Sequence, residues 1–191
     1  APEQIIYPLD VKPYLLPTAH TPVDGLVLET ARKITGNEQD PLKKARLIYE
    51  WVSSHMERDN DVIGCGTGDV AEILKSGKLK GKCTDMSSVF VALARASGIP
   101  ARELFGIRLG KANKLERYSK SAFGKADSAG VADVSGGQHC RAEFYLAGYG
   151  WLPCDPADVT KMRLAEKKSH QDADVQAVNT YLFGNWEMNW V

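Results

Sequence analysis

The chain has 191 residues, and 24 Lys plus Arg balance 24 Asp plus Glu, so its formal net charge is zero. This length fits one domain with a substantial hydrophobic core, and the charge balance excludes binding to nucleic acid or to an anionic membrane through bulk charge alone. No apolar run reaches the ~20 residues needed to cross a bilayer, so we expect no membrane insertion.

Prolines recur through the first part of the chain, where they fix the backbone and remove hydrogen-bond donors. We expect residues 1–25 to form an extended, Pro-rich leader that lies over a single domain at 26–191, whose core spans 40–158. The N-terminus, which begins Ala1-Pro2 without a signal peptide, looks trimmed, and the C-terminal end at 186–191 looks cut inside an element.

Three helices are expected before the middle of the chain. The first spans 26–35, and the second begins after Asp40 as its N-cap and runs to about His55. A third, short helix follows Asp69, whose capping-box partner is Glu72 three positions on.

A helix of about four turns is expected to begin at Cys83 and to end before Gly98, which Ile99-Pro100 follow as a stop signal. Its apolar residues recur at helical spacing on most sides, which predicts burial. A thiol in the first turn of a buried helix lies where the helix dipole and free backbone N–H groups favour thiolate. Cys83 is therefore a candidate nucleophile, although a buried inert cysteine has the same pattern.

The order of elements, helices first and several strands afterwards, favours an α+β fold over alternating βαβ units. The elements expected after the central helix are a strand at 101–109, a long loop at 110–137, a hairpin of strands at 138–146 and 150–155, and helices at 159–168 and 173–179. The long loop is either a lid that contacts the substrate or a disordered surface insertion.

The expected hairpin sorts its side chains onto two faces, because neighbours alternate across a strand. His139 and Asp155 fall on an accessible polar face, and Cys140 and Cys154 fall on the core face. A turn centred on Ala147 places His139 opposite Asp155 and Cys140 opposite Cys154. Opposed cysteines are close enough for a disulfide. Small buried cysteines nevertheless fill apolar faces well, so we expect two reduced thiols.

A His–Asp pair on a sheet is often only a surface ion pair. The buried helix favours a different interpretation, because its thiol beside this pair completes a set of nucleophile, base and orienting carboxylate. In that arrangement Cys83 attacks, His139 holds the proton and Asp155 fixes the imidazole tautomer. The backbone N–H of Cys83 then helps to bind the oxyanion.

Three motifs occur within residues 81–158, in the order Cys, His, Asp. They are Gly81-Lys82-Cys83-Thr84-Asp85 with the exit Gly98-Ile99-Pro100-Ala101-Arg102, the strand Gln138-His139-Cys140-Arg141-Ala142-Glu143-Phe144-Tyr145, and the strand Gly150-Trp151-Leu152-Pro153-Cys154-Asp155-Pro156. Together they resemble the transglutaminase-like superfamily and its bacterial members. The resemblance implies a papain-like transglutaminase core and a Cys83–His139–Asp155 triad that acts through a thioester acyl-enzyme.

The resemblance does not settle the reaction. Members of the superfamily hydrolyse peptide or amide bonds, transfer the acyl group to amines, or have lost activity. We therefore expect a cysteine protease, amidase or transglutaminase with a peptide or protein substrate, and the alternative is an inactive binding or scaffold domain.

One position departs from many members of the family. Where these carry an aromatic residue two positions after the histidine, this chain has Arg141. If Arg141 lines the site, it favours an acidic or carboxylate-bearing substrate. Trp151 is the second residue expected to contact substrate.

No cofactor or metal is expected. A zinc site made by Cys83, His139 and a cysteine of the hairpin is disfavoured, because the neighbours His139 and Cys140 point to opposite faces of a strand. A calcium site is disfavoured too, since Asp127 and Asp133 lack a calcium-loop pattern.

The compartment is left open by the cysteines, because four in a chain of this length are too few for a disulfide scaffold and form no CxxC pair. The trimmed look of the N-terminus and the bacterial resemblance favour export to the periplasm over a cytoplasmic location. The sequence predicts no oligomeric state.

Overall fold

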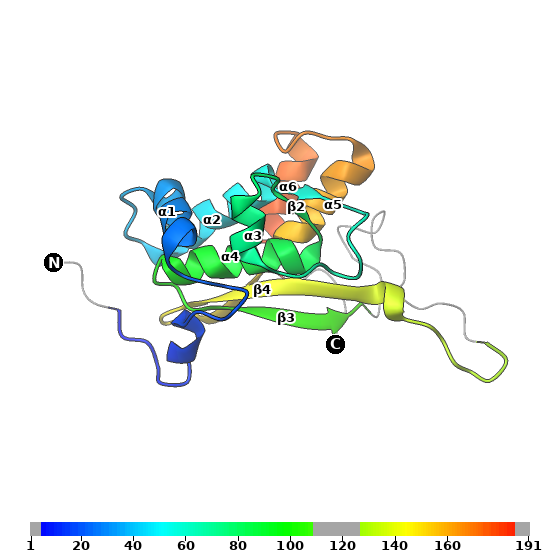
Figure 1. Ribbon diagram of the computed structural model, residues 1–191, viewed down its shortest axis with the longest axis horizontal. Helices are drawn as coiled ribbons and strands as arrows, with labels where there is room; N and C mark the ends of the chain where they lie inside the picture. The colour runs from blue at the N-terminus through cyan, green and yellow to red at the C-terminus, as the bar shows by residue number, and fades with distance from the viewer. Residues whose placement is uncertain (1–4, 109–126, 186–191) are drawn as a thin grey trace.

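The computed structural model describes residues 5–108 and 127–185, which form an α+β fold with helices on one side of a sheet (Figure 1). The antiparallel sheet has the order β3-β4-β5, from β3 Ala101–Ile107, β4 Gln138–Leu146 and β5 Gly150–Cys154. The helices are α1 Gly25–Thr35, α2 Pro41–His55, α3 Val70–Lys75, α4 Cys83–Ala96, α5 Pro156–Glu166 and α6 Ala173–Tyr181. A short parallel pair joins β1 Glu57–Arg58 to β2 Lys80–Gly81. The predicted α+β class is confirmed.

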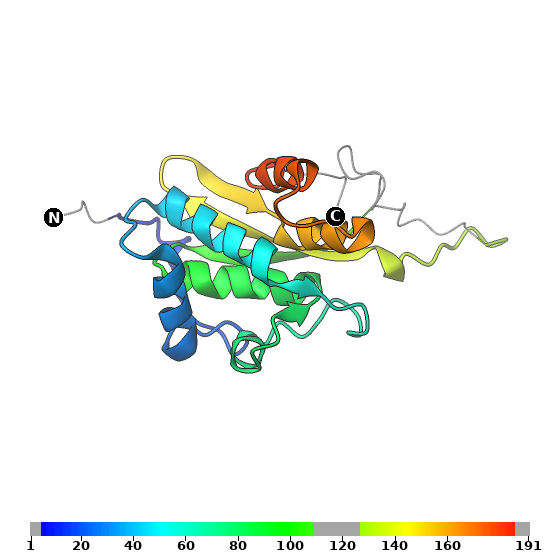
Figure 2. The same cartoon turned by 90° about the horizontal axis from the view of Figure 1, so that it is seen from above.

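Helix α4 is the centre of the hydrophobic core. It contacts α1, α2, α3, α5 and the strands β3 and β4, and α2 runs beside it (Figure 2). Every residue from Cys83 to Ala94 is buried, and the ring of Phe90 lies 6.2 Å from that of Phe144 in the sheet. The chain leaves the helix through Gly98, whose φ of 80° suits glycine. The predicted buried helix is confirmed.

Local capping rules placed the other early helices correctly. The Asp40 carboxylate accepts hydrogen bonds from two backbone N–H groups in the first turn of α2. Asp69 accepts one from the N–H of Glu72 at 3.1 Å, and α1 ends at Gly36. Helix α5 begins at Pro156, three residues before the predicted start, because Asp155 caps it and proline suits the first helical position.

The hairpin forms as predicted, but its register differs by two residues. Ala142 lies opposite Cys154, and the turn is centred on Gly148, whose φ is 83°. The turn centred on Ala147 is therefore wrong. A shift of two residues leaves every side chain on its predicted face. It removes both expected pairs, because Cys154 now lies opposite Ala142 and β5 ends before Asp155.

The same register separates two cysteines that were expected to face each other. Cys140 pairs with Phe105 of the neighbouring strand β3, and Cys154 pairs with Ala142. All four cysteines are free thiols. The expected reduced state of Cys140 and Cys154 is confirmed, although the expected opposition between them is not.

The polar face of the hairpin is buried, not accessible as predicted. His139, Arg141 and Glu143 are all at most 7 % exposed. Burial is tolerable because their charges are paired: Arg102 donates to Glu143, and Arg141 contacts Asp155.

The N-terminal segment covers part of this face. The ring of Tyr7 lies 6.2 Å from that of Tyr145, and the ring of Tyr14 lies 4.9 Å from that of Trp151. A short 3₁₀ helix at Lys12–Leu15 interrupts the expected extended conformation.

Some sequence expectations fall outside the described residues. These include the C-terminal end at 186–191 and most of the predicted loop, of which the structure describes only 127–137. None of the helices in the described part of the chain has the length and apolar character of a bilayer-spanning segment.

Candidate active site

The three candidate catalytic residues come from three different elements. Cys83 is the first residue of α4, His139 lies in β4, and Asp155 is the residue that caps α5. The Nε2 atom of His139 lies 2.7 Å from Oδ2 of Asp155, and both side chains are buried. The His–Asp contact predicted from strand pairing therefore exists, but it forms beyond the end of β5.

The cap of α5 explains how Asp155 is oriented. Its Oδ1 atom accepts a hydrogen bond from the backbone N–H of Asp158 at 3.0 Å, as an N-cap side chain does. Its Oδ2 atom is then directed at His139. One carboxylate thus starts a helix with one oxygen and holds the imidazole with the other.

The electrostatic environment favours an ion pair between thiolate and imidazolium. A hydrogen bond from Cys140 lowers the pKa of the Cys83 thiol against the opposing effect of burial, and hydrogen bonding and charge from His139 lower it further. Burial opposes a charged His139, but the carboxylates of Asp155 and Asp158 outweigh it and raise the pKa of the imidazole. Both shifts stabilise the reactive form of the thiol near neutral pH.

Two residues of the site were missed in the sequence. Asp158 Oδ1 lies 3.8 Å from Nε2 of His139, and a guanidinium N–H of Arg108 donates to the same Oδ1 at 2.5 Å. Burial opposes ionisation of Asp158, but the charges of Arg108 and His139 prevail and lower the pKa of its carboxyl. The only signal for Asp158 was its place one helical turn after Asp155, and nothing in the spacing pointed to Arg108.

Both expected substrate contacts, Arg141 and Trp151, lie among other side chains of the protein. Arg141 is 2 % exposed, and its Nε lies 3.3 Å from Oδ2 of Asp155, the atom that also holds His139. Arg141 thus stabilises the carboxylate and leaves little of its own surface exposed, and the expected preference for an acidic substrate stays a prediction. Trp151 packs against Tyr14, and the guanidinium of Arg102 lies 4.1 Å from its ring; its expected contact with substrate stays a prediction.

A glycine-rich loop closes over the N-terminus of α4. The buried Asp85 carboxylate accepts hydrogen bonds from the backbone N–H groups of Thr67, Gly68 and Lys82 at 2.8–3.0 Å. The backbone of Gly66 approaches so closely that a Cβ there would lie 2.0 Å from Oδ2 of Asp85. Asp85 thereby fixes this loop against the helix that carries the thiol.

Among the described residues, two groups of side chains have donor atoms close enough to bind a metal ion. One contains Cys65, Cys83 and Cys140, and the other contains His139, Asp155 and Asp158. Arg108 and Arg141 already balance the carboxylates of the second group. The first group contains thiols only.

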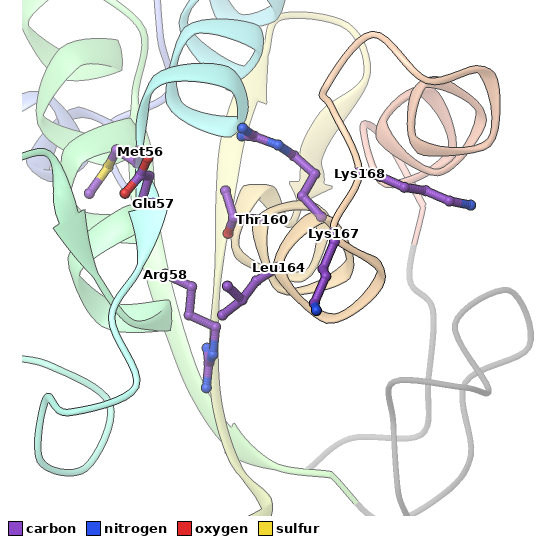
Figure 3. A pocket seen from close by; sticks show the side chains of 8 residues that line it. Met56, Glu57, Arg58, Thr160, Leu164, Lys167 and Lys168 are labelled. Carbon is purple, nitrogen blue, oxygen red and sulfur yellow. The ribbon is translucent and has the colours of Figure 1, made fainter.

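A pocket of about 270 Å³ lies between β1 and α5, and none of these residues lines it (Figure 3). Thr160 and Leu164 lie at its centre in Figure 3, and Lys168 points away from them. Two of its basic side chains are engaged: Lys168 pairs with acidic side chains, and Arg163 donates to a backbone carbonyl of α2 at 2.7 Å.

Comparison with known proteins places this chain in a family. Residues 28–156 match the model of the transglutaminase-like superfamily. An uncharacterized protein of Haemophilus influenzae is 66% identical over 190 residues, which cover 100% of this chain and 52% of that protein. The chain thus spans about half the length of this relative.

Two crystal structures share the fold. A candidate cysteine protease from Cytophaga hutchinsonii has a TM-score of 0.58 and 23% identity, over 79% of this chain and 43% of that one. The periplasmic domain of TgpA from Pseudomonas aeruginosa has a TM-score of 0.56 and 18% identity, over 90% of this chain and 53% of that one. With a family match over most of its length and a papain-like arrangement of helices and sheet, the chain belongs to the transglutaminase-like superfamily.

Proposed function

We propose that this chain catalyses acyl transfer on a peptide or amide bond of a peptide or protein substrate, with Cys83 as nucleophile. The observation that carries the proposal is the buried contact of 2.7 Å between His139 and Asp155, beside a thiol whose pKa is lowered at the N-terminus of α4. Membership of the superfamily agrees with this chemistry.

In the first half of the reaction, the Cys83 thiolate attacks the carbonyl carbon of the substrate. The negative charge that develops on the carbonyl oxygen is stabilised by the backbone N–H of Cys83 at the start of α4, since the neighbouring N–H groups of Lys82 and Thr84 already donate to Asp85 and Cys65. The His139 imidazolium gives its proton to the departing amine, which leaves a thioester on Cys83.

In the second half, water or a primary amine attacks the thioester, and neutral His139 accepts a proton from this nucleophile. Asp155 keeps the imidazole oriented in both halves, because its second oxygen is fixed by the cap of α5. Hydrolysis releases an acid, whereas transfer to an amine forms a new amide. Both reactions return Cys83 as thiolate.

The test is to incubate the chain with a diverse peptide pool and a tagged primary amine, and to analyse the products by mass spectrometry. Incorporation of the tag in a Cys83-dependent manner means transamidation, and new peptide termini mean proteolysis. Cys83→Ala is the negative variant, and Cys154→Ala is the matched control because Cys154 is a buried thiol of the core. If wild type and Cys83→Ala give identical product mixtures, the domain is a binding or scaffold module and the proposal is wrong.

A further inference from the structure

Three of the four cysteines converge at the N-terminus of α4, although they are far apart in the sequence. Cys65 lies in the loop after β1, Cys83 begins α4, and Cys140 lies in β4. Their sulfur atoms all lie within 4.8 Å of one another. Cys154 is not in this group and is buried in the core at the end of β5.

One residue holds the three thiols together. The backbone N–H of Thr84, next to Cys83, donates to the carbonyl of Cys65 at 2.9 Å. The hydroxyl of Thr84 lies 3.1 Å from the sulfur of Cys140. Thr84 thus links the loop and the strand to the first turn of the helix, and the hydrogen bonds of Asp85 fix the loop that follows Cys65.

We propose that Cys65, Cys83 and Cys140 form a binding site for one thiophilic divalent cation of the Zn²⁺ type. Tetrahedral zinc with Zn–S bonds of about 2.3 Å places its sulfur ligands roughly 3.8 Å apart. Sulfur atoms within 4.8 Å of one another therefore need shifts of only about 1 Å to reach this spacing. Thiolates are also the ligands that select soft and borderline cations over Mg²⁺ or Ca²⁺.

The loop offers both an entry path and the freedom for this adjustment. Cys65 is partly exposed, whereas Cys83 and Cys140 are buried. Gly64 and Gly66 flank Cys65, and both have positive φ. Three converging thiols suit one ion better than a disulfide, which uses two sulfur atoms and leaves the third unused. A water molecule completes the tetrahedron at the open side of the loop.

Occupation of this site has a consequence for the reaction, and this consequence rests on the proposed function. A cation bound to the sulfur of Cys83 withdraws the electron pair that attacks the substrate, so it inhibits acyl transfer reversibly. Binding of the cation itself does not depend on activity.

Cadmium is the probe, because thiolate ligation to Cd²⁺ gives an ultraviolet charge-transfer band. The fully reduced, oxygen-free chain is titrated with Cd²⁺, and we expect one ion per chain with a band of the strength of three thiolates. Loss of an outer-shell partner alone costs about 10- to 100-fold in metal affinity, so Cys65→Ser and Cys140→Ser should each weaken binding by at least about tenfold. Circular dichroism verifies that both variants are folded.

Cys154→Ala is the matched control and should bind Cd²⁺ like wild type, since this thiol lies outside the group. The inference is overturned if Cys65→Ser binds Cd²⁺ as tightly as wild type, or if Cys154→Ala loses as much affinity as Cys65→Ser. It is also overturned if the wild-type chain gives no charge-transfer band.

A second measurement separates this inference from the proposed function. Zn²⁺ should slow alkylation of Cys83 by iodoacetamide in wild type by at least about tenfold and should protect Cys65→Ser far less, because that variant lacks one ligand. Cd²⁺ binding without any Cys83-dependent product leaves the inference standing and removes the proposed function. Products without Cd²⁺ binding do the reverse.

Discussion

Cys83 and Cys154 are both buried thiols, but their surroundings drive their acidity in opposite directions. At Cys154, burial and then the nearby charges of Asp155 and Glu143 raise the pKa well above its usual range. At Cys83, the hydrogen bond from Cys140 and the interactions with His139 lower the pKa despite burial. Burial alone makes a thiol inert, and only hydrogen-bond donors and a positive neighbour make it a nucleophile.

The largest effect is expected from removing the two thiols in turn. Cys83→Ala should reduce acyl transfer by roughly 10⁴-fold or more, because no other group supplies the nucleophile. Cys154→Ala should keep most of the activity. Product formation from the peptide pool, measured by mass spectrometry at equal concentrations of folded protein, checks both expectations. Comparable losses in the two variants would contradict the distinction between the thiols.

Asp155→Asn separates orientation of the histidine from helix capping. The asparagine oxygen can still accept the hydrogen bond from the N–H of Asp158, so α5 should remain capped. Its amide cannot hold His139 as the carboxylate does, and we expect a loss of roughly 10³- to 10⁴-fold in kcat. Thermal unfolding is the control measurement. An active variant with a large loss of Tm would show that Asp155 acts only as a cap.

The reactivity of Cys83 should persist into acid. A lowered pKa means that the thiolate survives as the pH falls, until the pH reaches the lowered pKa itself. An ordinary thiol of pKa about 8.5 is only roughly 0.3 % thiolate at pH 6. We therefore expect alkylation of Cys83 by iodoacetamide at pH 6 to exceed that of unfolded chain by about 100-fold.

The raised pKa of His139 sets the upper pH limit of the ion pair between the Cys83 thiolate and the His139 imidazolium. Its imidazolium persists above the usual histidine range and is lost as the pH rises through the raised pKa, so kcat/KM should fall there on the alkaline side. His139→Ala should remove this alkaline fall and slow alkylation at pH 6. An alkylation rate at pH 6 that His139→Ala leaves unchanged would argue against the ion pair.

The smallest expected effect is a loss of stability, and it concerns the glycine-rich loop that closes over α4. Gly66→Ala places a Cβ within 2.0 Å of Asp85 at a φ of 101°, so it should lower the free energy of unfolding by about 2 kcal/mol. Gly64→Ala is the matched control, because its φ is also positive but its Cβ meets nothing within 4 Å. Denaturant unfolding compares the two. Equal losses of stability would mean that the contact with Asp85 contributes nothing.

The sequence allowed most of the fold and the candidate residues of the site to be predicted, because these signals are local. Helix α4 was found from apolar spacing and the glycine at its exit, and β4 from alternation along the strand. The superfamily motifs pointed to Cys83, His139 and Asp155, whose His–Asp contact the structure contains; their catalytic roles stay a prediction. The hairpin register was wrong because a shift of two residues leaves the pattern of buried and polar side chains unchanged.

These local signals do not predict contacts between segments that are far apart in the sequence. Arg108 and Asp158 are 50 positions apart, and Thr84 and Cys140 are 56 positions apart, so no spacing rule connects them. Burial of the polar face of β4 was missed for the same reason, since it depends on Arg102, Asp155 and a distant N-terminal segment.

The sequence by itself thus determined which elements form, the family, and a thiol at the start of a buried helix, because periodicity and capping act over a few residues. Only the tertiary structure decided what surrounds that thiol. Packing of the loop, the helix and the strand brings Cys65 and Cys140 to Cys83, and the cap of α5 aims Asp155 at His139. The acidity of a thiol depends on such neighbours within a few ångströms, whatever their separation along the chain.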